Sequence, residues 1–504
     1  MPVNLSDVSS FQDAVVTVMG LGRYKQGSGI GAAKWLMRHG AQLVITDLKT
    51  MEEMRESVDE ITHWYETYRA QFPERTIYQP VFVLSEHRAQ DFTDVDLVVQ
   101  NPGVPRESEF VLLAREKGVP IESDMSLFFR YCPFPIYAVT GTRGKSTTTA
   151  LLGEMFRLGN PKTVVAGNIT RSPLEDLDWL LEEKSPVPVV LEMSSWLIES
   201  LENVDRGPDI GILTNIYPDH LNRYASLDAY AQSKLQLFRH CKGDQKVVLN
   251  ADHEMVRSLG TGIACRKYWF GASVTSGVGT TPDVGSKLTP DVGSSLSAFL
   301  RDGKVICAVE GKEHVLGDVE TMALKGEHNL LNALAASLAA HLAGVPVEHI
   351  AAALLTFKGL PGRQEIVKEV RGVAYVNDTT ATSPDGTMAA LDRFAAKKEK
   401  NVILICGGAS KGLPYAAFGK RVAAACRLVV YLDGSATPDM RAAVGEDVSW
   451  MLVSSMDEAV KAAAKAAKEG DTVLLSPGAA SFGMFQNEFD RGEQFVEAVK
   501  KVKE

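Results

Sequence analysis

The chain has 504 residues, and its 53 Lys and Arg against 63 Asp and Glu give a formal net charge of −10 at pH 7. This length allows about three domains, each able to bury its own core. The acidic balance and the lack of a basic tail argue against nucleic acid as the main partner, because binding to a phosphate backbone needs clustered Lys and Arg.

The cysteines and the apolar segments indicate the compartment. Six cysteines form no CxxC pair and no Cys/His group at zinc spacing, so we expect reduced, buried thiols. Residues 1–11 lack the apolar core and basic flank of a secretory signal. The Ala-rich stretch 330–345 is broken by Asn332 and His341, which fits a packed helix better than a membrane span. We therefore expect a cytoplasmic protein that does not insert into membranes. We also expect a monomer.

The first block, residues 1–135, opens with a nucleotide-binding pattern. We predict a strand over 14–19, a Gly-rich loop over 20–31, a helix over 32–39 and a strand over 42–46 that ends at Asp47. The glycines are spread over a longer loop than the GxGxxG fingerprint permits, so NAD is only a second choice for this pocket.

Later in this block, a buried strand over 96–99 ends in Asn101-Pro102-Gly103-Val104. The carboxyl ends of strands are where open α/β sheets bind ligands. Pro-Gly is also a common turn dipeptide, so these residues alone favour an ordinary turn.

The middle block, residues 136–358, carries the most informative motif. An apolar run over 136–139 leads into Gly141-Thr142-Arg143-Gly144-Lys145-Ser146-Thr147-Thr148, and a helical segment follows over 149–158. The glycines let backbone N–H groups face phosphate oxygens, the Lys neutralises phosphate charge, and a hydroxyl can reach Mg²⁺. Val139 stands where the longer P-loop has Gly, so the match is to the shorter G-T-x-G-K-S/T form.

Two further strands of the middle block end in polar residues. The strand over 187–191 delivers Glu192, and the strand over 210–214 delivers Asn215 through Asp219-His220. If these strands are parallel, Glu192 and His220 could bind cations that bridge phosphate oxygens. A helix over 230–238 places Lys234 on a face with Tyr230 and Phe238, where a Lys that merely reaches out to water is an equal alternative.

Residues 276–297 repeat Thr-Pro-Asp-Val-Gly-Ser, starting at Thr281 and at Thr289. Their Gly, Ser and Pro content predicts a flexible surface insertion without a catalytic role.

The third block, residues 359–504, begins at a Pro- and Gly-containing hinge. Strands over 373–376, 402–406, 428–432 and 472–475 alternate with helices, which predicts a third doubly wound α/β domain. Three of the strands end in runs of small, polar and cationic residues: 377–382, 407–411 and 476–481. Such groups at one sheet edge suit a small substrate that carries a carboxylate.

The set of motifs resembles the Mur ligase family over nearly the whole chain except the insertion. The resemblance rests on the order of Gly141-Thr-Arg-Gly-Lys-Ser, Glu192-Met-Ser-Ser, Asn215 to His220, Lys234, His328-Asn329, Leu360-Pro-Gly-Arg363, Asn377-Asp378 and Ser476-Pro-Gly-Ala-Ala-Ser481. It implies a Rossmann-like domain for a UDP-sugar, a central P-loop-type domain for ATP and Mg²⁺, and a Rossmann-like C-terminal domain for an amino acid. It also implies ligation of D-glutamate to UDP-N-acetylmuramoyl-L-alanine through an acyl phosphate.

The resemblance also implies roles for individual residues. The residues implied to bind ATP are Gly141, Thr142, Arg143, Gly144, Lys145, Ser146, Thr147, Asn329, Arg363 and Asp378. Those implied to hold the metal are Ser146, Glu192, His220 and Lys234, the last as a carbamate. Those implied to line the UDP-substrate site are Gly20, Gly22, Asp47, Asn101, Pro102, Gly103 and Asn168. Those implied to bind the amino acid are Thr382, Lys411, Ser481 and Phe489. Lys145, His220 and Lys234 would be the catalytic residues.

The third block departs from the family pattern at several positions, and the aromatic residue expected after Ser481 is shifted by one residue, to Phe489. Where the family has Asp-Ser-Lys-Ala-Thr, this chain has Asp378-Thr379-Thr380-Ala381-Thr382, so Thr380 replaces a Lys that helps hold the carboxylate of glutamate. L-glutamate or another amino acid therefore remains an alternative. An NAD-dependent dehydrogenase and a non-catalytic nucleotide-binding regulator are the alternatives from other classes.

Overall fold

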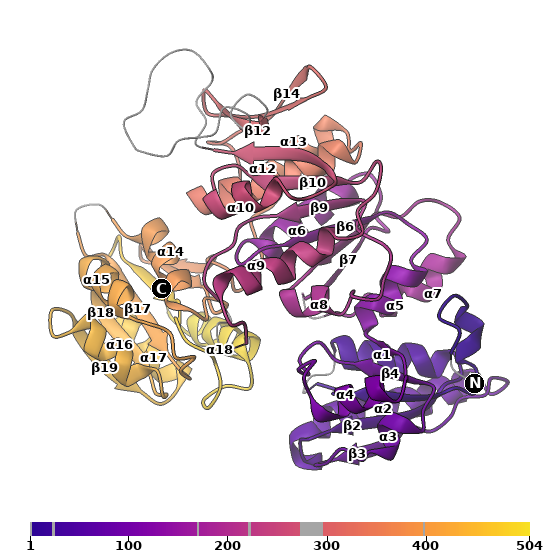
Figure 1. Ribbon diagram of the computed structural model, residues 1–504. Helices are drawn as coiled ribbons and strands as arrows, with labels where there is room; N and C mark the ends of the chain where they lie inside the picture. The colour runs from indigo at the N-terminus through magenta and orange to yellow at the C-terminus, as the bar shows by residue number, and fades with distance from the viewer. Residues whose placement is uncertain are drawn as a thin grey trace. The chain divides into compact units, whose positions relative to one another are not determined.

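The computed structural model describes residues 3–22, 26–168, 171–219, 223–272, 296–396 and 399–503. Contacts divide the chain into two compact units, Met1–Phe357 and Lys358–Glu504, which are considered separately below (Figure 1). The division into three domains with boundaries near 135 and 358 stays a prediction.

The first unit opens with a parallel sheet in the order β3-β2-β1-β4-β5. Its strands are β1 (Val15–Met19), β2 (Gln42–Asp47), β3 (Val81–Leu84), β4 (Leu97–Gln100) and β5 (Ile121–Glu122). The accompanying helices are η1 (Val8–Phe11), α1 (Ser28–Arg38), α2 (Met51–Gln71), α3 (Gln90–Thr93), α4 (Glu109–Glu116) and α5 (Asp124–Tyr131). The strand order reverses between β1 and β4, which is where sheets of this class open a crevice for ligands.

Helix α1 differs from the prediction at its start. It begins at Ser28, four residues before the predicted start at Ala32, so Gly29 and Gly31 belong to the helix and not to the loop. A Cβ at Gly29 would press on the carbonyl oxygen of Leu21, and one at Gly31 would overlap the side chain of Ser172. These glycines serve close packing of the helix, which the loop interpretation did not anticipate.

The second sheet of this unit runs in the order β14-β13-β12-β11-β10-β9-β6-β8-β7. Its strands are β6 (Ile136–Thr140), β7 (Val164–Gly167), β8 (Val189–Glu192), β9 (Ile210–Leu213), β10 (Lys246–Asn250), β11 (Arg266–Gly271), β12 (Leu296–Arg301), β13 (Lys304–Val309) and β14 (Lys312–Asp318). The helices are α6 (Lys145–Arg157), α7 (Leu174–Glu182), α8 (Ser195–Glu199), α9 (Leu227–Leu235), η2 (Gln236–Phe238), α10 (Glu254–Gly260), α12 (Glu327–Leu342) and α13 (Val347–Thr356).

The second sheet is parallel from β7 through β12, and an antiparallel edge of β12, β13 and β14 extends it. Of this sheet, only β6, β8 and β9 were predicted as strands; β7 and the run from β10 to β14 were not. Residues 276–295 of the predicted insertion lie outside the described residues, and its last two, Leu296 and Ser297, open β12. The apolar segment predicted over 330–345 lies in helix α12, and none of the helices in the described ranges is long and apolar enough to cross a membrane.

One hydrophobic cluster joins the two sheets of the first unit. It includes Trp35 on α1, Phe128 on α5 and Leu177 on α7, all fully buried, and it continues to Leu213 on β9. Helices α1, α5 and α7 pack against one another, so the first 357 residues form one unit despite having two sheets.

The second unit contains a sheet in the order β15-β16-β20-β17-β18-β19, parallel except for β15. Its strands are β15 (Glu365–Val370), β16 (Val373–Asn377), β17 (Val402–Gly407), β18 (Cys426–Leu432), β19 (Ser449–Val453) and β20 (Thr472–Leu475). The helices are α14 (Pro384–Phe394), α15 (Ala416–Ala425), α16 (Thr437–Val444), α17 (Met456–Ala466) and α18 (Glu488–Lys500). The predicted α/β fold with largely parallel sheets is confirmed, and all six cysteines are free and buried, as predicted.

Candidate active site

The turn of the Gly141-to-Thr148 motif lies between β6 and α6, in the middle of the second sheet. It is called the phosphate loop below, after its predicted ligand. Residues 141–144 form the turn, and helix α6 begins at Lys145, four residues before the predicted start. Strand β6 lies between β8 and β9, so the polar ends of all three strands meet at the same edge of the sheet. The chain thus brings Glu192 and Asn215 to either side of the loop, as predicted.

Two glycines give the loop its shape. Gly141 and Gly144 have φ angles of +146° and +79°. A Cβ at Gly141 would overlap Oγ1 of Thr214, and one at Gly144 would overlap Oδ1 of Asn332. Only glycine combines these backbone angles with so close an approach of neighbouring side chains.

The segment that follows β9 forms hydrogen bonds with the phosphate loop. Asn215 accepts a hydrogen bond from Thr142 N at its carbonyl (2.9 Å) and one from Arg143 N at Oδ1 (2.8 Å). The hydroxyl of Thr142 accepts from Tyr217 N at 2.9 Å, and the guanidinium of Arg143 lies 5.2 Å from the Tyr217 ring centroid. These contacts hold the loop in one shape before any ligand is present.

Lys145 and the first turn of α6 carry the groups that were predicted to bind phosphate. Nζ of Lys145 donates to the carbonyl of Thr142 at 3.0 Å, so the ammonium folds back over its own loop. Ser146 and Thr147 follow it and are 6% and 9% exposed. A cation, hydroxyl groups and the N-terminus of a 13-residue helix are together suited to phosphate oxygens.

A series of hydrogen bonds through Asn329 and Asn332 connects helix α12 to Thr148, in the first turn of helix α6. Nδ2 of Asn329 donates to the carbonyl of Lys325 (2.9 Å), Nδ2 of Asn332 donates to Oδ1 of Asn329 (3.2 Å), and the hydroxyl of Thr148 donates to Oδ1 of Asn332 (3.3 Å). Asn332 was considered above only as an interruption of an apolar helix. Its spacing of three residues from Asn329, on one helix face, was the available signal for its role.

Glu192, at the end of β8, is 2% exposed. Its Oε1 accepts a hydrogen bond from Nδ2 of Asn168 at 3.1 Å, which joins a residue predicted for the metal to one predicted for the UDP-substrate. Oε2 of Glu192 is buried and has no hydrogen-bond partner within the described ranges. A buried carboxylate oxygen of this kind fits a ligand of Mg²⁺, a hard cation that prefers oxygen ligands.

Lys234, on α9, is 1% exposed, and its Nζ lies 4.5 Å from the centroid of the Tyr230 ring. Burial and the neighbouring charge of Lys145 hold the pKa of Lys234 well below its usual value, although Asp219 and Glu192 act in the opposite direction. The alternative that Lys234 reaches out to water is therefore wrong. His220 lies outside the described residues, and the described part of the chain contains no cluster of three His, Cys, Asp or Glu that could hold a metal.

Several residues predicted for the UDP-substrate lie close together where β1 and β4 end, whereas Asn168 lies beside Glu192 in the second sheet. Gly20 and Gly22 have φ angles of +83° and +88°, and a Cβ at Gly20 would lie 3.1 Å from Cβ of Asn101. Asn101 N donates to the carbonyl of Met19 at 2.9 Å, and Oδ1 of Asn101 accepts from Gly103 N at 3.0 Å. This Asx turn includes Pro102.

Asp47 ends the neighbouring strand β2 and is 7% exposed. Its Oδ1 accepts a hydrogen bond from Lys49 N at 3.1 Å. Asp47 therefore lies at the same edge of the first sheet as Gly20 and Asn101, since β1 is the neighbour of both β2 and β4.

In the second unit, the ends of β16, β20 and β17 lie side by side, and hydrogen bonds join their loops. The hydroxyl of Ser476 donates to Oδ2 of Asp378 at 2.7 Å, and Gln364 N donates to Oδ1 at 3.1 Å. Burial raises the pKa of Asp378 to about 7, against the opposing effect of these donors and of Arg363. Asp378 and Arg363 are thus close enough to interact electrostatically, as their predicted shared role requires.

The predicted amino-acid residues are partly brought together. Nζ of Lys411 donates to Oγ1 of Thr382 at 2.9 Å. The loop that contains Ser481 pairs with the loop that contains Lys411 through Ala480 and Ala409, whose backbone hydrogen bonds are 2.9 and 3.1 Å long. Phe489 lies in the first turn of α18 and is 46% exposed.

Two residues of this region were not predicted to be structural. Thr380, which replaces the family Lys, uses its hydroxyl to donate to the carbonyl of Gly362 at 3.0 Å. Arg491 is fully buried on α18 and donates to Oγ1 and the carbonyl of Thr379 (3.1 and 2.7 Å) and to the carbonyl of Ala479 (3.2 Å). A single Arg in a helical segment gives no sequence signal for such a role.

Two protein-family models match this chain. Residues 139–340 match the family model described as Mur ligase middle domain, and residues 362–478 match the one described as Mur ligase, glutamate ligase domain. A UDP-N-acetylmuramoylalanine--D-glutamate ligase from Roseiflexus sp. (strain RS-1) is 40% identical over 491 residues, which cover 96% of this chain and 97% of that relative.

Solved structures share the fold. A UDP-N-acetylmuramate-alanine ligase from Thermotoga maritima aligns with a TM-score of 0.57 at 20% identity, covering 97% of this chain and 100% of that one. A MurF ligase from Thermotoga maritima, solved in complex with ADP, aligns with a TM-score of 0.53 at 18% identity, covering 99% and 98%.

The full-length match at 40% identity decides the family, and it argues against the dehydrogenase alternative, which rested on the first Gly-rich loop alone. The phosphate loop, Glu192 and Lys234 are all present and in order within the matched middle domain. The chain belongs to the Mur ligase family.

Proposed function

We propose that this protein is the ATP-dependent ligase that joins D-glutamate to UDP-N-acetylmuramoyl-L-alanine, in the cytoplasm and as a monomer, during synthesis of peptidoglycan precursors. The observation that carries the proposal is the full-length match to a relative named for this reaction. The ordered phosphate loop beside a buried Glu192 supports the part of the proposal that concerns ATP.

The proposed reaction has two steps. A carboxylate oxygen of the alanyl group attacks the γ-phosphorus of ATP, ADP leaves, and an acyl phosphate forms. The glutamate nitrogen, as a neutral amine, then attacks the acyl carbon, phosphate leaves, and the nitrogen releases a proton to water. Both steps concentrate negative charge, which fixed cations and backbone N–H groups stabilise without reorganisation.

The residues of the phosphate loop are proposed to bind ATP together with Asn329, Arg363 and Asp378. Lys145 would release the carbonyl of Thr142 and turn to the phosphates. Ser146, Glu192, His220 and carbamylated Lys234 are proposed to hold Mg²⁺, which when bound neutralises charge between phosphate oxygens.

Carbamylation of Lys234 is proposed from its surroundings. A fully buried ammonium near Lys145 is costly, whereas a neutral amine can add CO₂ and release a proton to give an anionic carbamate. The carbamate would replace an unfavourable cation with a ligand for Mg²⁺ close to Glu192.

Thr382, Lys411, Ser481 and Phe489 are proposed to bind glutamate. The contact of Lys411 with Thr382 supports a carboxylate site at this point, because an ammonium beside a hydroxyl donor suits one carboxylate. L-glutamate stays as a second candidate, since Thr380 is bonded to Gly362 and replaces the family Lys.

The experiment that tests the proposal measures phosphate release from ATP in the presence of UDP-N-acetylmuramoyl-L-alanine, with D-glutamate, L-glutamate or no amino acid in parallel reactions. Release that depends on D-glutamate and is lost in Lys145→Ala supports the proposal. Release only with L-glutamate would replace the amino acid, and no release with either would contradict the ligation. ATP binding without any acceptor-dependent release would favour a non-catalytic regulator.

A further inference from the structure

Arg363 stands between two residues whose backbones are left-handed. Gly362 has a φ angle of +70° and Gln364 has one of +48°. A glycine adopts such an angle freely, whereas a residue with a Cβ atom does so only at a steric cost. Arg363 itself is exposed to solvent. The angle at Gln364 therefore needs a reason, because a surface loop is usually free to relax such strain.

Both neighbours of Arg363 are bonded to the loop that follows strand β16. The carbonyl of Gly362 accepts hydrogen bonds from N and Oγ1 of Thr380, at 3.2 and 3.0 Å. Gln364 N donates to Oδ1 of Asp378 at 3.1 Å. Asp378 and Thr380 are close together in one loop, so the backbone on both sides of Arg363 is fixed to the same segment.

Arg393, in the last turn of helix α14, also binds Gln364. Its Nη1 donates to the carbonyl oxygen of Gln364 at 3.4 Å and to Oε1 of the same residue at 3.2 Å. Burial lowers the pKa of Arg393, and the charge of Asp378 opposes this effect. Within the described residues, the hydrogen-bond acceptors of Arg393 are thus neutral oxygens of Gln364. A half-buried guanidinium therefore holds one strained residue in place.

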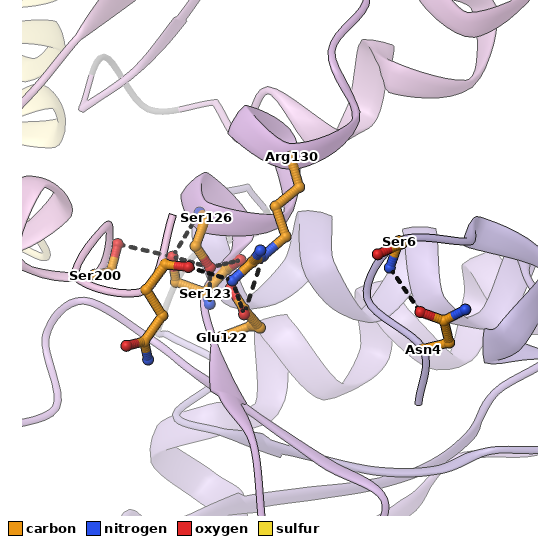
Figure 2. A network of polar contacts seen from close by, with 8 residues as sticks. Asn4, Ser6, Glu122, Ser123, Ser126, Arg130 and Ser200 are labelled. Atoms are coloured by element: carbon orange, nitrogen blue, oxygen red, sulfur yellow. Dashed lines mark hydrogen bonds and ion pairs between the residues drawn. The ribbon is translucent and has the colours of Figure 1, made fainter. Parts of the chain in front are cut away.

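An arginine of the first unit shows a different arrangement. Arg130, on helix α5, donates to Oε1 of Glu122 at 2.8 Å (Figure 2), so a carboxylate balances its charge. Arg130 also donates to the carbonyl of Asn203 at 2.7 Å. Arg130 and Arg393 each fasten a helix to another segment, but of these two only Arg393 binds a residue with a left-handed backbone.

Arg371, at the other end of strand β15, has a left-handed backbone for a local reason. Arg371 (φ +51°) and Gly372 (φ +70°) form the two-residue turn between the antiparallel strands β15 and β16. Tight hairpins of this kind require positive φ angles. Gln364 precedes β15 and belongs to no such hairpin, so turn geometry does not explain its angle.

We propose that Gln364 is a positioning residue for the nucleotide. Its backbone, held in the left-handed region by Asp378 and Arg393, fixes the direction in which the preceding residue, Arg363, leaves the chain. This inference rests on the proposed function, in which Arg363 and Asp378 bind ATP. A cation that is already oriented loses little loop and side-chain freedom when the nucleotide binds. Tighter nucleotide binding thereby offsets the steric cost at Gln364.

The test places valine, which strongly disfavours positive φ angles, at both ends of β15. Gln364→Val and Arg371→Val start from nearly the same angle, +48° and +51°, so both are expected to lower the Tm to a similar extent. Calorimetric titration with a non-hydrolysable ATP analogue and Mg²⁺ measures binding. We expect about tenfold weaker binding for Gln364→Val and binding within about twofold of wild type for Arg371→Val. Equal affinities for the two variants would overturn the proposal.

Milder variants separate the backbone of Gln364 from its side chain. Gln364→Gly and Gln364→Asn adopt the left-handed conformation at less steric cost, so both are expected to bind the analogue within about threefold of wild type. A loss as large as that of Gln364→Val in both would contradict positioning by the backbone. Arg393→Gln is expected to weaken binding by about threefold to fivefold, because it removes hydrogen bonds to Gln364. Arg130→Gln, the matched control, should lower the Tm without changing this affinity.

A double variant tests whether the effect depends on Arg363. Arg363→Ala is expected to weaken binding of the analogue at least as much as Gln364→Val does. In the Arg363→Ala protein, the addition of Gln364→Val is expected to change the affinity by less than about twofold, because the positioned cation is already gone. A further tenfold loss in the double variant would contradict the positioning of Arg363.

Binding of the analogue requires neither acceptor nor amino acid, which separates this inference from the proposed function. If the wild-type protein binds the analogue but catalyses no ligation, the proposed function fails, whereas weaker binding by Gln364→Val than by Arg371→Val still supports the positioning role. If ligation proceeds and these two variants bind the analogue equally, only the positioning role fails. A wild-type protein that does not bind the analogue contradicts both.

Discussion

Nζ of Lys234 lies 4.5 Å from the centroid of the Tyr230 ring, one turn earlier on helix α9. The aromatic face is a favourable neighbour for a cation, but it provides no counter-ion for a side chain that is 1% exposed. The arrangement suits a lysine whose amine is neutral and can therefore react.

Carbamylation of Lys234 predicts a dependence on dissolved CO₂. Ligase activity of the wild-type protein is expected to fall in CO₂-depleted buffer at mildly alkaline pH and to recover on addition of bicarbonate. The low activity expected of Lys234→Ala should not respond to bicarbonate. Carbon NMR after addition of ¹³C-bicarbonate should show a carbamate signal in the wild-type protein and none in the variant. A wild-type spectrum without that signal would contradict the modification, whatever the activity.

Gly144→Ala is expected to abolish ATP turnover and to destabilise the protein. The new Cβ would meet Oδ1 of Asn332 at a backbone angle of φ +79°, so both strain and overlap oppose it. Gly303→Ala is the matched control, because Gly303 has φ +72° with open space around it. Strain alone should cost about 1–2 kcal/mol there and leave turnover intact. Chemical denaturation and ATP turnover measure the two effects, and equal results for both variants would be inconsistent with tight packing of the loop.

The raised pKa of Asp378 predicts that the stability of the folded protein falls as the pH rises. Its pKa rises from 3.8 to about 7 in the folded protein. Between these values the unfolded chain releases the proton and the folded protein keeps it, so stability falls as the pH rises through this window and stays level above it. Asp378→Asn should remove this component, with a gain relative to wild type of about 2–4 kcal/mol at pH 8 compared with pH 4. Denaturant unfolding at both pH values measures the difference, and parallel pH profiles would contradict it.

Thr380→Lys restores the residue of the family pattern and is expected to lower the KM for glutamate, because an additional cation would lie beside the proposed carboxylate site. The change also removes the hydrogen bond to the carbonyl of Gly362, which should cost about 1 kcal/mol of stability. Thr380→Val is the control, since it loses the same hydrogen bond without adding a charge. If the KM for glutamate changed equally in both variants, the cause would be the lost hydrogen bond in the loop and not the added positive charge.

The sequence predicted the α/β fold because strands and helices alternate with clear periods, and it placed Glu192 and Asn215 beside the phosphate loop because parallel strands end at one edge. It could not predict that α1 begins at Ser28, since the close packing of Gly29 against Leu21 and of Gly31 against Ser172 is not visible in the sequence. Strands β13 and β14 were missed because an antiparallel edge follows a segment without periodic pattern. Arg491 could not be recognised, because its role arises from partners 12 and 112 residues away.

The buried guanidinium of Arg491 has a consequence for how an amino acid would be selected. It holds Thr379 and Ala479 from one point, so the loops after β16 and β20 are already ordered relative to each other before a ligand arrives. Binding then carries little entropic penalty for assembling these loops, and affinity can come from few contacts. Because the backbone of these two loops is fixed, it cannot bend to fit the other enantiomer of glutamate. Binding of that enantiomer would instead require different side chains at positions such as Thr382 and Lys411.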